Sequence, residues 1–279
     1  MQTRILPAAR GAAWIDTGFR IYRRNPPLLT FLTLAYLSFI LLVSGVPFLG
    51  ACLPVLLPLL LVFIANICRI VAQGTPTPRG AFFAGLRERR RDLLRLGILQ
   101  LLGTVALLLV EQILPGSDAG QLIVIDKEGA MTPAEGVDAV DIFLAMLRLF
   151  VIALPLMLAF WFAPLLTAWH DLPALKSLFF SIVAVWRNWR AFLAYGVTAL
   201  LIGAVAPALL MAVGGLISPK LGQMISGMLG VLIVMVYAPV LLTGAYCSYV
   251  EVFGPGPEPA THAGTGNADD GGEENHAPE

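Results

Sequence analysis

The chain of 279 residues is 58% hydrophobic and only 13% charged, and its formal net charge is zero. A water-soluble domain of this length could not cover so much apolar surface, so the composition excludes an ordinary soluble protein. Of the 18 Lys and Arg residues, 15 lie in the segments 4–24, 69–95 and 176–190. These segments adjoin apolar runs, which favours contact with a membrane surface and argues against nucleic acid as a partner.

Six apolar runs are each long enough to cross a hydrocarbon core of about 30 Å as a helix. They are residues 28–49, 51–70, 96–114, 149–168, 192–217 and 224–250. The gap between the third and fourth runs, about 115–141, is acidic, whereas basic residues fill the N-terminal segment and the second and fourth gaps. Because Lys and Arg are retained on the cytoplasmic side, we expect both termini in the cytoplasm. The predicted fold class is all-α: a polytopic membrane helical bundle with six transmembrane helices.

A short amphipathic helix, which we call an elbow, is predicted before the first, third and fifth runs. In residues 10–24, 79–95 and 174–190, apolar and aromatic residues recur at helical spacing beside basic residues. Such helices lie flat at the membrane interface, with aromatic side chains towards the acyl chains and basic ones towards anionic headgroups. The candidate lipid-interface residues are Trp14, Arg20, Arg23, Arg24, Arg87, Arg90, Arg91, Arg95, Lys176, Trp186, Arg187, Trp189 and Arg190.

The membrane domain, residues 1–253, would therefore consist of three units of elbow, span and span. Their boundaries are about 10–72, 79–168 and 174–253, and a disordered cytoplasmic tail follows over 254–279. Within the acidic extracytoplasmic loop, residues 121–125 predict a short strand. Thr132-Pro133-Ala134-Glu135 predicts a helix start, with Thr as the cap and Pro at the first helical position.

Few titratable groups are available for catalysis. His170 and Asp171 follow the fourth run, but adjacent residues on a helix point in different directions. We interpret them as an interfacial His and a helix-capping Asp, with a catalytic pair as the alternative, and expect no enzyme. Cys52, Cys68 and Cys247 lack the spacing of a metal site or disulfide framework, so neither a metal nor another cofactor is expected.

Six prolines lie inside the runs: Pro54, Pro58, Pro155, Pro164, Pro207 and Pro239. Proline kinks a helix and frees a carbonyl, and broken helices at corresponding positions of a repeat can mark a transport site. Proline is also commoner in membrane helices than in soluble ones, which is the simpler explanation. Charged residues near the runs, such as Glu111 and Arg148, lie close to predicted span ends, which counts against a proton-driven pump.

Several short motifs carry a family resemblance. They are WIDTGF at 14–19, RRNP at 23–26, FAPLL at 162–166, WHD at 169–171, PALKS at 173–177, FFS at 179–181 and WRN at 186–188. Together, over about residues 10–253, they resemble an uncharacterised family of six-span proteobacterial inner-membrane proteins. More distantly, the elbow-and-hairpin plan is similar to membrane domains attached to some glycerophosphodiesterases, without their catalytic domain. The resemblance implies an inner-membrane location and a six-helix fold, and it assigns no catalytic residues.

We therefore expect a non-enzymatic inner-membrane protein that organises or senses the envelope. Its partners would be membrane lipids, and other membrane proteins or a second copy of the chain are further candidates. The alternative is a transporter or channel-like protein for a lipid or an apolar small molecule, which the prolines inside the runs favour.

Overall fold

The structure is a computed structural model. It describes residues 4–74, 79–114, 123–125, 131–134 and 137–254. Within these ranges, six helical segments are long and apolar enough to cross a membrane. They are Pro26–Ser44, Pro47–Gln73, Arg90–Ile113, Val140–Trp169, Trp189–Ile217 and Pro219–Phe253. Each contains one of the predicted apolar runs or most of it, so the predicted all-α, six-span fold class is confirmed. Most of the predicted acidic loop over 115–141 and the tail over 255–279 lie outside the described residues.

The first helices are bounded by the residues expected to begin and end a helix. Helix α1 (Ala9–Tyr22) precedes a hairpin of α2 (Pro26–Ser44) and α3 (Pro47–Gln73). The side chain of Asn25 accepts a hydrogen bond from the Leu28 N–H and so caps α2, with prolines at the first helical positions. Helix α3 ends at Gly74, whose φ of 65° is the left-handed conformation that glycine adopts without strain.

The second hairpin follows the 3-10 helix η1 (Arg79–Phe83) and consists of α4 (Arg90–Ile113) and α5 (Ala139–Phe160). Between them, β1 (Ile123–Ile125) pairs antiparallel with β2 (Met131–Pro133), and β1 lies where a short strand was predicted. The predicted helix start at Thr132 is wrong, because Thr132 and Pro133 belong to β2. Helix α5 begins instead at a capping box, in which the Asp138 N–H donates to the Asp141 carboxylate at 3.1 Å.

The third hairpin follows two shorter helices, α6 (Ala163–Trp169) and α7 (Ala174–Arg187). Its outgoing arm consists of α8 (Trp189–Leu200), the π turn η3 (Leu201–Val205) and α9 (Ala206–Ile217). Its returning arm consists of α10 (Pro219–Leu232), the π turn η4 (Ile233–Tyr237) and α11 (Ala238–Phe253). Each π turn immediately precedes an Ala-Pro pair, because proline lacks the N–H that a continuous α-helical ladder requires.

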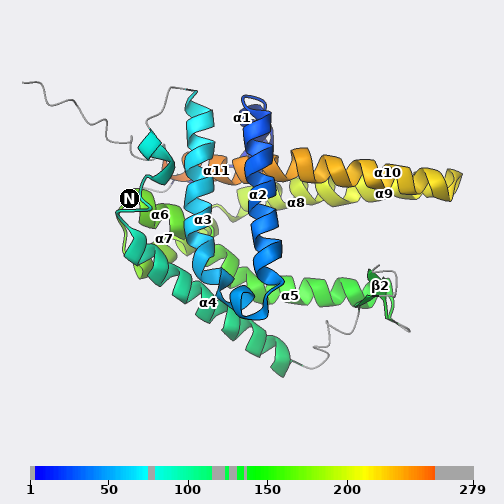
Figure 1. The fold of residues 1–279 in the computed structure, drawn as a ribbon, viewed down its shortest axis with the longest axis horizontal. Helices are drawn as coiled ribbons and strands as arrows, with labels where there is room; N and C mark the ends of the chain where they lie inside the picture. Colours follow the sequence, from blue (N-terminus) through cyan, green and yellow to red (C-terminus); the bar gives the residue numbers. More distant parts are fainter. Residues whose placement is uncertain (1–3, 75–78, 115–122, 126–130, 135–136, 255–279) are drawn as a thin grey trace, which may run out of the picture.

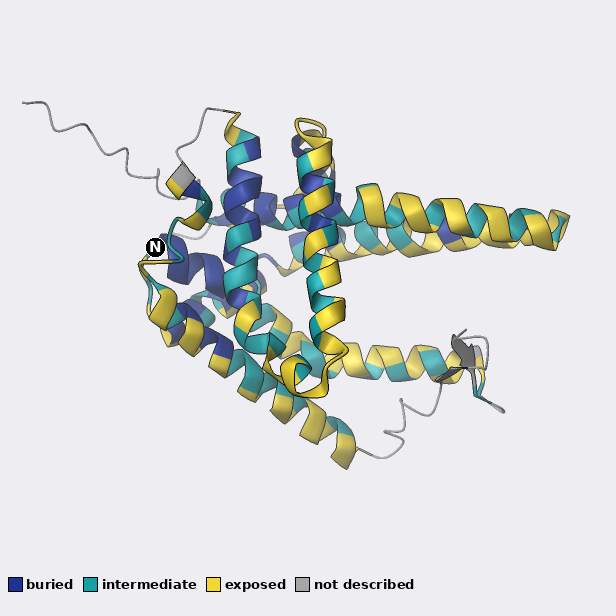
Figure 2. Cartoon of the chain, in the orientation of Figure 1, coloured by how far each residue is buried: buried dark blue, intermediate teal, exposed yellow. Residues whose placement is uncertain are grey.

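The three hairpins spread apart from one shared core (Figure 1). Helices α2 and α3 stand side by side, α4 and α5 diverge below them, and the α8–α11 hairpin projects to the right of the view. Buried residues gather where α1, α3, α6 and α11 meet, whereas the far ends of the hairpins are exposed (Figure 2). The exposed positions on the spans are largely apolar, among them Phe31, Leu41 and Leu216, as expected for helices that face lipid.

One of the three predicted elbows is essentially a single helix, since α1 covers most of residues 10–24. The elbow predicted over 174–190 consists of α7 and the first two residues of α8, with a break at Asn188. The prediction of one helix over 79–95 is wrong: η1 and a series of turns occupy 79–89, and Arg90–Arg95 already belong to α4. Gly85 explains the break, because its φ of 75° interrupts a helix and its backbone lies against the Ala168 carbonyl, where a Cβ would overlap. Whether the elbows lie at a membrane interface remains a prediction.

Candidate functional site

Trp14 lies at the centre of the core. Its side chain is 0% exposed, and its Nε1–H donates to Oε2 of Glu251 at 3.0 Å. The indole also packs edge-on against Phe192, with ring centroids 5.2 Å apart, and lies 5.8 Å from the ring of Tyr195. The prediction that Trp14 contacts lipid at the interface is therefore wrong, because α1 is enclosed by α8 and α11.

Glycines on α1 make this enclosure possible. A Cβ at Gly11 would overlap the carbonyl oxygen of Ala191, and one at Gly18 would lie 2.8 Å from the backbone nitrogen of Gly244. Thr243 on α11 donates its hydroxyl to the Gly18 carbonyl at 3.0 Å. The backbone of α1 therefore packs directly against the backbones of α8 and α11, and the side of α1 that carries Trp14 faces the interior of the protein.

The basic residues of α1 remain on the outside. Arg20 forms an i,i+4 ion pair with Asp16, and the Arg24 guanidinium donates to the Ala72 carbonyl at the end of α3. Arg23 is also exposed. Arg10 pairs with Glu251, and this hydrogen bond and attraction raise the pKa of Arg10. The structure therefore leaves the predicted arginines of this segment accessible to a headgroup layer.

Two buried asparagines form side-chain hydrogen bonds to the chain segments that connect the helices. Asn66 is 0% exposed; its Nδ2 donates to the carbonyls of Phe82 and Ala84 at 3.1 and 3.0 Å, and its Oδ1 accepts from Trp169 Nε1 at 3.0 Å. The Arg69 guanidinium, on the same helix as Asn66, lies 4.8 Å from the centroid of the Trp169 ring. Asn66 therefore binds the chain before α4 to both α3 and α6.

Asn188 has the corresponding role at the junction of α7 and α8. Its Oδ1 accepts from the Leu6 N–H at 2.8 Å, and its Nδ2 donates to the carbonyls of Arg4 and Ala184 at 3.0 and 2.9 Å. Asn188, Trp169 and Trp14 all belong to motifs that carry the family resemblance. These motif residues build the core.

The side chains of His170 and Asp171 contact different parts of the protein. Asp171 is exposed, and its carboxylate accepts from Arg89 Nε at 2.6 Å. The prediction that Asp171 caps a helix is wrong, because Pro173 occupies the N-cap position of α7 and no side chain caps this helix. The His170 ring lies 6.2 Å from that of Tyr249; burial lowers the pKa of His170, and the charge of Asp171 partly offsets this. Among the described residues, no group of three His, Cys, Asp or Glu side chains could hold a metal ion.

The basic segment before the third span is also exposed. Arg87, Arg90, Arg91 and Arg95 all lie on the surface. The Arg87 guanidinium lies 5.5 Å from the centroid of the Phe83 ring, and Arg95 donates to Asp92 at 3.0 Å. These four residues therefore remain candidates for contact with lipid, although they are not presented by one amphipathic helix.

An exposed apolar surface covers one side of α7 and the start of α8. We call it the aromatic-basic face; it consists of Leu175, Phe179, Ile182, Trp186 and Trp189 with the neighbouring Lys176, Arg187 and Arg190. Leu175 and Trp186 are each 70% exposed and Phe179 is 63% exposed. The Arg190 guanidinium lies 5.5 Å from the centroid of the Trp189 ring. This face has the combination of aromatic and basic side chains that a membrane interface favours.

The opposite side of α7 explains why the large side chains point outward. It presents small residues, and two of them, Ser177 and Ser181, make hydrogen bonds in the interior. The Ser181 hydroxyl donates to the Leu158 carbonyl at 2.8 Å and accepts from the Phe162 N–H at 3.0 Å. Ser177 accepts from the Thr167 hydroxyl at 2.8 Å. Because this side is fixed against α5 and α6, the aromatic-basic face is held outward by the fold.

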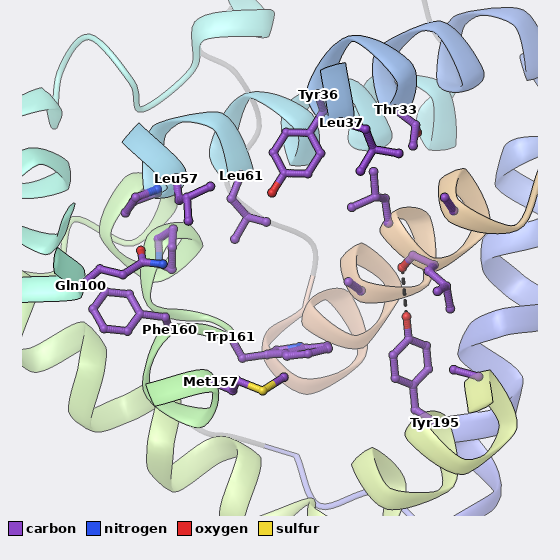
Figure 3. A pocket seen from close by; sticks show the side chains of 17 residues that line it. Thr33, Tyr36, Leu37, Leu57, Leu61, Gln100, Met157, Phe160, Trp161 and Tyr195 are labelled. Atoms are coloured by element: carbon purple, nitrogen blue, oxygen red, sulfur yellow. Dashed lines mark hydrogen bonds between the residues drawn. The ribbon is translucent and has the colours of Figure 1, made fainter. Parts of the chain in front are cut away.

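A cavity of about 630 Å³ lies between the hairpins, and all six spans contribute to its lining. Two of the six prolines inside the runs, Pro58 and Pro164, belong to the lining. Its walls are otherwise mostly aliphatic and aromatic side chains, and Tyr36 directs its hydroxyl into the hollow (Figure 3). This volume and composition are those of a site for a small apolar ligand.

Comparison with known proteins supports the conclusion that this is a membrane protein. A probable inner membrane protein from Burkholderia thailandensis is 33% identical to the chain over 262 residues, which cover 91% of the chain and 93% of that protein. No protein-family model matches the chain, and no solved structure matches it. The name of the relative and the six candidate spans identify a multi-pass membrane protein. Because the identity extends over nearly the full length of both proteins, the chain belongs to the family of probable inner membrane proteins that includes this relative.

Proposed function

We propose that the protein is a non-enzymatic component of the bacterial inner membrane that binds anionic lipid at the cytoplasmic leaflet, with both termini in the cytoplasm. The aromatic-basic face of α7 and α8 is the observation that supports this function most directly. The distribution of Lys and Arg supports the cytoplasmic placement.

Aromatic and basic side chains would contribute to membrane binding in different ways. Trp186 and Phe179 gain free energy by leaving water for the region between headgroups and acyl chains. Lys176 and Arg190 then lie beside the phosphates, where each cationic side chain contributes about 1 kcal/mol of attraction to an anionic membrane surface. The exposed arginines of the other two basic segments would extend this contact around the rim of the protein.

The double substitution Lys176→Gln/Arg190→Gln tests this function. The full-length protein is reconstituted in vesicles of phosphatidylethanolamine and phosphatidylglycerol, and native mass spectrometry counts the lipids that remain bound after gentle release. We expect the wild type to retain phosphatidylglycerol in preference, and the double variant, which loses about 2 kcal/mol of attraction, to show a preference reduced roughly thirtyfold.

Lys220→Gln is the matched control, since Lys220 lies in the first turn of α10, at the turn between the two arms of the third hairpin. It removes one positive charge from the opposite end of the spans and should leave the preference unchanged. Equal retention of phosphatidylglycerol by the wild type and the double variant would refute the proposed role of the face.

A second candidate function is the handling of a lipid or apolar small molecule, as in a transporter or carrier. The cavity between the hairpins, with Pro58 and Pro164 in its lining, favours it. This candidate is independent of the aromatic-basic face, because the cavity and the face share no residue.

A further inference from the structure

The cavity between the hairpins is lined by residues from the interior of all six spans. Tyr36, Gln100 and Ala199 line it, and each lies ten residues beyond the first residue of its span, which is Pro26, Arg90 and Trp189, respectively. Every lining residue also belongs to one of the six apolar runs predicted to cross the hydrocarbon core. The cavity is therefore placed within the hydrocarbon region of the membrane.

The lining carries no charged side chain. Five lining residues have a polar side-chain group: Thr33, Tyr36, Gln100, Trp161 and Tyr195. The other members are apolar side chains, including Pro58, Leu61, Met157 and Leu241. An ion at this depth would lose its hydration without gaining a partner, so a ligand with a charged group in the cavity is strongly disfavoured.

Three of the five polar groups are already used within the protein. The Thr33 hydroxyl donates to the Leu29 carbonyl at 2.8 Å, and the Tyr195 hydroxyl donates to the Leu241 carbonyl at 2.9 Å. The Trp161 indole donates to the Ser248 hydroxyl at 3.3 Å. These groups fix the walls of the cavity, and their donor hydrogens are not available to a ligand.

The Tyr36 hydroxyl and the Gln100 side-chain amide differ from these three groups. Within the part of the chain that the structure describes, neither makes a side-chain hydrogen bond. In Figure 3 the Tyr36 ring extends from α2 into the hollow, and Gln100, from α4, lies apart from it at another edge of the hollow, beside Phe160. A polar group at this depth gains free energy from any neutral oxygen that it can hydrogen-bond, since no bulk water competes there.

We infer that this cavity binds a neutral lipid that combines a long hydrocarbon part with one hydroxyl or carbonyl oxygen, held at Tyr36 and Gln100. The apolar walls accommodate the hydrocarbon, and the two polar side chains select the oxygen. A volume of about 630 Å³ falls within the range of about 300–1,000 Å³ that is usual for ligand sites. The inference does not depend on lipid binding at the aromatic-basic face.

Photolabelling with a diazirine-bearing hexadecanol tests this inference. The full-length protein is reconstituted in phosphatidylethanolamine and phosphatidylglycerol vesicles, irradiated and digested, and the labelled peptides are identified by mass spectrometry. We expect saturable labelling of the peptides that contain Pro58, Trp161 and Leu241. Unlabelled hexadecanol should compete more effectively than hexadecane, which has the same chain without the oxygen.

Two variants separate the shape of the cavity from its polar contact. Ala199→Phe places a ring in the cavity and should abolish the saturable labelling, whereas Ala208→Phe, at an exposed position of α9, should leave it unchanged. Tyr36→Phe removes one oxygen with little change of shape and should reduce the advantage of hexadecanol over hexadecane by about threefold to tenfold. Because Tyr36→Phe preserves the ring, its result stands even if Ala199→Phe fails to fold.

Three results would overturn the inference. Labelling spread evenly over the six spans without saturation would show that the cavity is not a binding site. Equal competition by hexadecanol and hexadecane in the wild type would show that no oxygen is selected. The third result uses phosphatidylglycerol with a photoreactive acyl chain. If this lipid labels the same peptides and prevents their labelling by hexadecanol, the cavity binds an ordinary membrane phospholipid.

Discussion

Replacing Trp14 by alanine is expected to destabilise the fold by about 3–5 kcal/mol, the range found when a large aromatic side chain is removed from a packed core. The indole is fully buried between α8 and α11, and its loss also leaves the Glu251 carboxylate without one of its donors. The measurement is the midpoint of unfolding in detergent, followed by circular dichroism as denaturant is added.

Trp186→Ala provides the control for this prediction. It makes the same chemical change at a position that is 70% exposed, so it should shift the unfolding midpoint in detergent only slightly. If both substitutions cost the same, the assignment of Trp14 to the core and of Trp186 to the surface would be contradicted.

Asn66→Ala is expected to cost about 3 kcal/mol or more. The substitution removes one buried and two part-buried hydrogen bonds at once, leaving the Trp169 indole N–H and the carbonyls of Phe82 and Ala84 without this partner. Each unsatisfied buried group typically costs about 1–3 kcal/mol. The segment before α4 should also detach from α3, which limited proteolysis near Arg87 would detect as faster cleavage.

Gln100→Ala is the matched control for Asn66→Ala. Gln100 is the other amide well inside the predicted spans, yet within the described structure its side chain makes no hydrogen bond, so its removal should cost less than about 1 kcal/mol. A loss of stability with Gln100→Ala as large as with Asn66→Ala would mean that the Asn66 hydrogen bonds do not hold the fold together.

The six spans could be predicted because they depend on a property that every residue of a run shares. Apolar length alone decides whether a helix can cross a membrane, so each predicted run, or most of it, lies within a helical segment; the first run was predicted to end at 49, but its helix ends at Ser44. Helical spacing likewise placed Phe179 and Trp186 on one face of a helix, and in the structure both are on the exposed face of α7. The fourth span begins earlier than predicted because the capping box at Asp138 starts α5 before the continuous apolar run.

The environment of α1 could not be predicted, because an apolar stripe has the same spacing whether it faces lipid or protein. What distinguishes α1 from α7 is the contact of Gly11 and Gly18 with backbone more than 170 residues away in sequence. A single sequence does not reveal such pairings. The same reason applies to Asn66 and Trp169, which are 103 residues apart and meet only in the folded protein.

The resemblance motifs were more informative about the fold than about a site. Trp14, Trp169 and Asn188 stand out in the motifs, and the structure places all three in the interior with hydrogen bonds to distant segments. The cavity residues are ordinary apolar side chains in apolar runs, so no pattern distinguished them. Only Pro58 and Pro164, noted as breaks in the spans, pointed towards it.

The depth of α7 in the membrane tests the central claim most directly. Single cysteines at Lys176, Phe179, Trp186 and Arg187, in a background with the exposed Cys52 replaced by alanine, would carry nitroxide labels in vesicles. Electron paramagnetic resonance then compares collisions with oxygen, which partitions into the membrane, and with a water-soluble nickel chelate. Labels at 179 and 186 should favour oxygen, and labels at 176 and 187 should favour the chelate. If the labels at 179 and 186 are as accessible to the chelate as those at 176 and 187, α7 does not lie at the membrane interface.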